Sequence, residues 1–168
     1  ALLAPSQASV ARAITLLAVG ASAGTVLLTH LIIVQLVRRW QGELNNRTAL
    51  QNGVALAGGV VGALTFSVSD SFWFNAGIAE VYALSTFFTA LVVWLVLRWS
   101  RAARREQRLR DDDRSLFQLN ANRYLVLVAA LFGMAIGVHL LSLLAFFLVG
   151  LIVFFVGYDR SGWTPRQR

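Results

Sequence analysis

The sequence predicts an all-α fold, a multipass bundle of about five transmembrane helices, from its composition and from the spacing of its charges. Of 168 residues, 57% are hydrophobic and only 14% are charged, and the mean hydropathy is +0.65. Long apolar runs alternate with arginine-rich connectors. Globular soluble domains carry nearly twice this share of charged residues. We therefore expect residues 1–168 to form a single integral membrane domain.

The first three spans follow apolar runs, because a helix needs about 20 residues to cross the hydrocarbon layer. Residues 13–37 contain no Asp, Glu, Lys or Arg, and this run ends at Arg38. A second, shorter run covers residues 53–69. The third covers residues 81–97 and stops at Arg98. Each run predicts one membrane-spanning helix.

The last apolar stretch, residues 124–158, is too long for one span. As a single helix it would measure roughly 52 Å at about 1.5 Å per residue, against about 30 Å of hydrocarbon. Its only histidine, His139, lies near the middle, next to Gly137-Val138. We expect a break there, which gives spans at 124–138 and 140–158.

The distribution of arginine predicts the orientation of these spans. With five crossings, the connectors 38–52 and 98–123 share one side with the tail 159–168, and this side holds 14 of the 15 basic residues. Arg12 alone falls on the other side. Since basic residues concentrate in cytoplasmic connectors, we expect the connectors and the C-terminus to be cytoplasmic.

The same distribution explains the net charge of +7 without nucleic acid. The basic residues set the topology and contact anionic lipid headgroups. The most highly charged segment, 101–114, reads as a solvated connector whose acidic and basic halves partly neutralise each other. All basic residues are arginine, so lysine Schiff-base chemistry is excluded, and the absence of cysteine excludes disulfides and thiolate chemistry.

Three pairs of glycines at four-residue spacing lie within the expected spans. Small residues at this spacing let neighbouring helices approach closely inside a membrane bundle. The pairs are Gly20 with Gly24, Gly58 with Gly62, and Gly133 with Gly137. They predict close helix packing but carry no information about oligomers.

Four ionisable residues fall on the side opposite the arginine-rich connectors: Asp70, Glu80, His139 and Arg12. Ionisable groups at membrane depth cost at least a few kcal/mol each, so they usually line a polar cavity or pair with each other. We expect Glu80 and His139 to line one cavity at this face. Asp70, Arg12 and the nearby Trp73 complete the set of candidate binding residues.

Three of these candidates also have a purely structural interpretation. Asp70 follows Ser69 and is equally suited to capping a helix. Trp73 and Phe74 fit an interfacial anchor better than a platform for a sugar ring. His139 is either a packed histidine or an anion contact. We expect no metal site, because two carboxylates from one hairpin are a weak cation signature.

Two stretches, SDSFWFNAGIAEVYALSTFFTALVVWLVLRW and GMAIGVHLLSLLA, resemble the bacterial glycosyltransferase-117 family of multipass membrane proteins. That family is similar to the transmembrane-type protein O-mannosyltransferase and belongs to the GT-C class. The resemblance runs from about Pro5 to Tyr158. It implies an inverting transferase in a bacterial inner membrane that passes a sugar from a polyprenyl-phosphate carrier, at the outer face, to a protein or glycan hydroxyl.

The resemblance also assigns residues. Asp70 and Glu80 match the acidic stretch of the family, and His139 matches the histidine of its Gly-Val-His-Leu-Leu turn. The expected catalytic carboxylate belongs to a loop upstream of residue 1, so the chain is either a fragment of a longer enzyme or an inactive relative. The alternative function is a non-catalytic membrane subunit that scaffolds a larger complex. A small transporter or channel fits least well, because the spans offer few polar groups.

Overall fold

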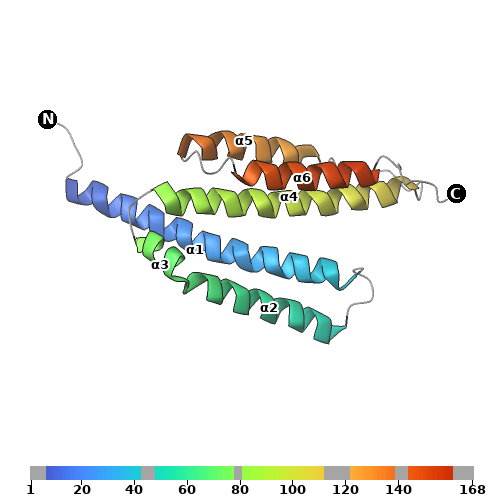
Figure 1. Cartoon of the computed structure of the whole chain (residues 1–168), viewed down its shortest axis with the longest axis horizontal. Helices are drawn as coiled ribbons and strands as arrows, with labels where there is room; N and C mark the ends of the chain where they lie inside the picture. The colour runs from blue at the N-terminus through green and yellow to red at the C-terminus, as the bar shows by residue number, and fades with distance from the viewer. Residues whose placement is uncertain (1–6, 43–47, 78–80, 112–121, 139–143, 161–168) are drawn as a thin grey trace. The chain divides into compact units, whose positions relative to one another are not determined.

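The computed structural model describes residues 7–42, 48–77, 81–111, 122–138 and 144–160. These residues form six helices, and the described part of the chain contains no strand (Figure 1). The all-α fold class predicted from the sequence is therefore confirmed. The chain divides into two compact units, residues 1–91 and 92–168, which are described separately below.

The first unit begins with α1 (Gln7–Trp40), which ends in a tight turn at Gly42. Gly42 has a φ of 92°, a left-handed conformation that glycine adopts without strain. Helix α2 (Ala49–Ser67) starts with a capping box in which Thr48 and Gln51 satisfy each other's backbone N–H groups. The Gln41 side chain donates to the Gln51 carbonyl at 3.2 Å, which joins the two helix ends.

Helices α1 and α2 lie side by side, and glycine allows their close approach (Figure 1). A Cβ built on Gly59 would lie 2.5 Å from Val34 and 2.8 Å from the His30 ring. A Cβ on Gly62 would lie 2.5 Å from Ile33. A side chain at either position would force these α1 side chains to move, so glycine favours the close approach of the two helices.

The start of α4 (Val81–Asp111) packs on α1 within the same unit. Ala18 and Ala21 of α1 are buried against Ala83, with Leu84 and Phe87 alongside. Gly24 lies under the Phe87 ring, which a Cβ at that position would meet at 2.6 Å. Small residues again set the distance between two helices.

The second unit contains the rest of α4 together with α5 (Asn122–Val138) and α6 (Leu144–Arg160). Its core is built around buried Trp99, Ala103 and Val156. Tyr124 and Leu125 of α5 pack against this core, as do two residues of α6, Ile152 and Val153. Large side chains fill the space between these three helices.

Among the residues that the structure describes, three helices are long and apolar enough to cross a membrane: Gln7–Trp40, Ala49–Ser67 and the Val81–Glu106 part of α4. The apolar parts of α5 and α6, Arg123–Gly137 and Phe147–Val156, are shorter. A 17-residue helix measures about 25 Å, slightly less than the hydrocarbon layer. Within the apolar stretch 124–158, the structure describes α5 as far as Val138 and α6 from Leu144 onwards.

Large apolar side chains are exposed along these helices, as expected where lipid takes the place of water. The exposed residues include Leu16, Leu17, Leu27, Val60, Val61, Leu64, Phe147, Phe154 and Phe155. Together with the three long apolar helices, they identify an integral membrane protein.

The structure adds two features that the apolar runs do not indicate. Helix α4 continues to Asp111, well beyond the end of the expected span at 97, because residues 98–111 include six arginines, which favour helix, and contain neither Gly nor Pro. A short helix, α3 (Asp70–Gly77), occupies part of the connector between α2 and α4. This short helix carries two of the candidate residues.

Candidate functional site

Helix α3 begins after a sharp break at the end of α2. Val68, the C-cap of α2, turns its backbone N–H towards the carbonyls of Leu64 and Phe66. The Ser69 hydroxyl also donates to the Phe66 carbonyl, at 2.8 Å. The rings of Phe66 and Phe72 contact each other across the break, with centroids 4.5 Å apart. These contacts fix the direction in which α3 leaves α2.

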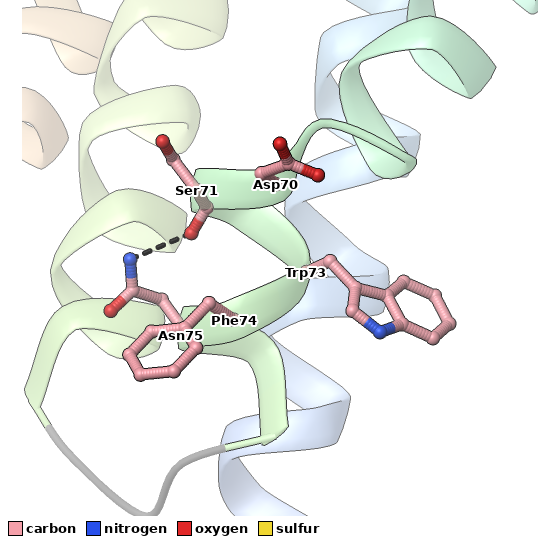
Figure 2. Close-up of a pocket in the computed structure, with 5 residues that line it drawn as sticks. All are labelled: Asp70, Ser71, Trp73, Phe74 and Asn75. Carbon is pink, nitrogen blue, oxygen red and sulfur yellow. Dashed lines mark hydrogen bonds between the residues drawn. The ribbon is translucent and has the colours of Figure 1, made fainter.

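A hollow of about 570 Å³ opens on α3 (Figure 2). Five residues of this helix line it: Asp70, Ser71, Trp73, Phe74 and Asn75. The lining therefore combines a carboxylate, a hydroxyl and an amide with two aromatic rings. Figure 2 shows Trp73 extending from one side of α3, with Ser71 and Asn75 on the other.

Asp70 is the first residue of α3, and its side chain is exposed. The carboxylate forms no hydrogen bond or ion pair with another residue that the structure describes. Instead, the backbone carbonyl of Ser69 accepts the Trp73 N–H at 2.9 Å and starts the helix. A negative charge in the first turn is stabilised by the helix dipole, and the carboxylate oxygens stay available to a ligand.

The other polar groups of the hollow are oriented by the helix itself. The Asn75 side-chain amide donates to the Ser71 carbonyl at 2.7 Å, which leaves the Asn75 side-chain oxygen as an acceptor (Figure 2). Trp73 is 73% exposed and Phe74 is 69% exposed. Such rings provide an apolar face beside hydrogen-bonding groups, the combination found in both sugar sites and interfacial anchors.

The structure describes three of the five candidates and brings two of these three together. Asp70 and Trp73 line the hollow, whereas Arg12 lies exposed near the start of α1 and is not part of the lining. Glu80 and His139 lie outside the described residues, so the cavity expected between them stays a prediction. The described residues contain no group of three or more His, Asp or Glu side chains placed to hold a metal ion.

Sequence reasoning did not single out Ser71 and Asn75 as lining residues. Their four-residue spacing places them on one face of a helix, and this spacing is the sequence feature that could have identified them as lining residues. It was not decisive, because a short polar and aromatic segment between two spans is equally typical of a loop.

The chain matches the family described as protein O-mannosyl-transferase TMEM260 N-terminal domain over residues 1–162. The chain belongs to this family. The match includes every described helix and the whole α3 hollow. No curated protein and no solved structure matches the chain. Membership supports the similarity to O-mannosyltransferases that the two quoted sequence stretches indicate, and it supports a glycosyltransferase-like role in general.

Proposed function

We propose that this protein is a membrane-embedded glycosyltransferase that transfers a sugar, with mannose as the leading candidate, from a polyprenyl-phosphate carrier to a hydroxyl group. The observation that carries the proposal is the family match over residues 1–162. The mixed carboxylate and aromatic lining of the α3 hollow supports it. The protein then belongs to the GT-C class and to its bacterial glycosyltransferase-117 branch, acting at the outer face of the inner membrane.

Glycosyl transfer with inversion needs a carboxylate that accepts the proton of the acceptor hydroxyl, and cationic or hydrogen-bonding groups that stabilise the departing phosphate. The exposed Asp70 carboxylate suits contact with the acceptor or with the sugar hydroxyls. Glu80 is a second carboxylate for the same task. Arg12 and His139 are the candidate partners of the phosphate, and Trp73 offers its ring to the sugar.

The first test measures transfer from radiolabelled polyprenyl-phosphate mannose to the proteins of membranes that contain the full-length gene product. We expect Asp70→Asn, Glu80→Gln and His139→Gln each to lower the transfer rate at least about tenfold, equivalent to about 1.4 kcal/mol of transition-state stabilisation. Each substitution removes a charge or a proton-transferring group while nearly preserving the volume.

His30→Gln is the matched control for His139→Gln. His30 lies within α1, against the Gly59 backbone of α2 and remote from α3 in sequence. We expect this variant to retain most of the transfer activity. Full activity in a Glu80→Gln/His139→Gln double variant would contradict the proposal, as would equal losses at His30 and His139.

The proposed orientation is tested by labelling single cysteines, since the native chain contains none. Ser71 and Arg105 are both exposed, whereas Ser100 is buried and unsuitable. In intact cells, an impermeant thiol reagent should label Ser71→Cys, while Arg105→Cys and Ser161→Cys should react only after permeabilisation. If Ser161→Cys is labelled in intact cells and Arg105→Cys is not, residues 124–158 cross the membrane once.

A further inference from the structure

An exposed apolar surface continues from the end of α2 onto α3. Val68 at the junction is largely exposed, and so are the two ring-bearing residues Trp73 and Phe74 of α3. Figure 2 shows the Trp73 ring extending away from the α3 ribbon. We propose that α3 is an interfacial helix, and that Trp73 and Phe74 insert into the lipid headgroup layer of the membrane.

The contacts of α1 place α3 at one edge of the hydrocarbon layer. Arg38 ends the uncharged run of α1 and marks the other edge. Ala18 lies 20 residues before Arg38, which is about 30 Å along a helix and equals the usual thickness of the hydrocarbon. Ala18 is buried against Ala83, at the start of α4. Because α3 contacts α1 and ends three residues before α4 begins, it lies near the level of Ala18, at the edge opposite Arg38.

The occupant of the exposed surface follows from its continuity with α2. Val60, Val61 and Leu64 of α2 are exposed, as expected for side chains in contact with lipid. The Phe66 and Phe72 rings, with centroids 4.5 Å apart, hold α3 against the end of α2. The exposed side of α3 therefore begins where the lipid-facing side of α2 ends, so membrane lipid covers both.

The polar residues of α3 select the headgroup layer over the hydrocarbon. Asp70 and Ser71 are exposed beside the two rings, and a carboxylate is costly at the centre of a bilayer. Trp73 and Phe74 follow Asp70 by three and four residues, so all three share one side of the helix. Tryptophan suits the headgroup layer because its ring is apolar while its N–H can donate to headgroup or water oxygens.

The opposite edge of the hydrocarbon carries a matching residue. Trp40 is almost fully exposed and follows Arg38 and Arg39 at the end of α1. It lies 22 residues from Ala18, about 33 Å along the helix. Tryptophan gathers at both membrane–water interfaces. Trp40 and Trp73 therefore bracket the membrane-spanning part of the first unit.

The first test measures tryptophan fluorescence of the full chain in phosphatidylcholine vesicles. The difference between the wild type and Trp73→Phe is the emission of Trp73. Lipids brominated close to the headgroup should quench this emission strongly, and lipids brominated near the ends of the acyl chains only weakly. Trp99→Phe gives the matched control, because Trp99 is buried and its emission should be quenched less by either lipid.

Two outcomes of this test would overturn the proposal. Stronger quenching of Trp73 by the chain-end bromines would place its ring in the hydrocarbon, and no quenching by either lipid would place it in water or against protein. The measurement needs no sugar donor, so its outcome is independent of the proposed transfer activity.

The second test measures the depth of Phe74. Since the native chain contains no cysteine, Phe74→Cys carries a single spin label. Electron paramagnetic resonance with oxygen and a water-soluble nickel complex should place this label about 5–10 Å into the boundary between headgroups and acyl chains. Leu64→Cys provides the benchmark in hydrocarbon, and Arg105→Cys the benchmark in water. A Phe74→Cys label as open to nickel as Arg105→Cys, or as deep as Leu64→Cys, would contradict the interfacial position of α3.

Discussion

The two units of this protein are both helical and apolar, but they are packed by opposite means. In the first unit, Gly59 and Gly62 of α2 and Gly24 of α1 let the neighbouring helix approach so closely that a Cβ there would displace one of its side chains. In the second unit, Gly133 and Gly137 face open space. There the helices are held by large side chains around a buried tryptophan.

This difference shows that a four-residue spacing of glycines allows close helix packing but does not indicate whether a neighbouring helix packs there. Gly58 and Gly62 form a four-residue pair, yet the residue that meets α1 together with Gly62 is Gly59. Gly20 and the Gly133–Gly137 pair make no contact at the Cβ position. Only the face that a helix turns towards its neighbour decides which glycine is needed.

The largest effect should follow from removing the tryptophan of the second unit. Trp99→Ala leaves a cavity between α4, α5 and α6, and we expect the free energy of unfolding to fall by about 3–5 kcal/mol. Trp40→Ala is the matched control, since Trp40 is 94% exposed, and it should change the free energy of unfolding by less than about 0.5 kcal/mol. Thermal unfolding in detergent micelles measures both. Equal effects would refute a packing role for Trp99.

The next largest effect concerns the glycine contact of the first unit. Gly59→Ala forces His30 and Val34 to move, and we expect a loss of about 1–3 kcal/mol in the free energy of unfolding. Gly58→Ala, one residue away, meets open space and should be neutral or slightly stabilising. If both alanine variants unfold at the wild-type temperature, α1 and α2 do not pack as closely at Gly59 as the structure shows.

The smallest effect is expected at Gly133 of the second unit. Because a Cβ there meets nothing within 4 Å, Gly133→Ala should stabilise α5 by up to about 1 kcal/mol through its better helix propensity. The same unfolding experiment measures this gain. A clear loss of stability would instead reveal that another helix or subunit packs on this face, and would extend glycine packing to the second unit.

Much of the helical architecture follows from the sequence alone. Hydropathy and the positions of the arginines predict an all-α membrane protein, and the described part of the chain is built of helices, some of them long and apolar enough to span a membrane. These properties are local: an apolar run must form its hydrogen bonds within itself when no water is present, so it forms a helix wherever it lies. The acidic and aromatic character of residues 69–85 also stands out without any structure.

The tertiary structure decided which residues share a surface. It placed Asp70 and Trp73 in one hollow with Ser71 and Asn75, and it left Arg12 outside that lining. Such choices depend on where a chain breaks its helix and on which face meets a neighbour, as at Val68 and at Gly59. Hydropathy depends on residues that are neighbours in sequence, whereas a site consists of residues that are neighbours in space. The packing of the helices decides which residues become neighbours in space.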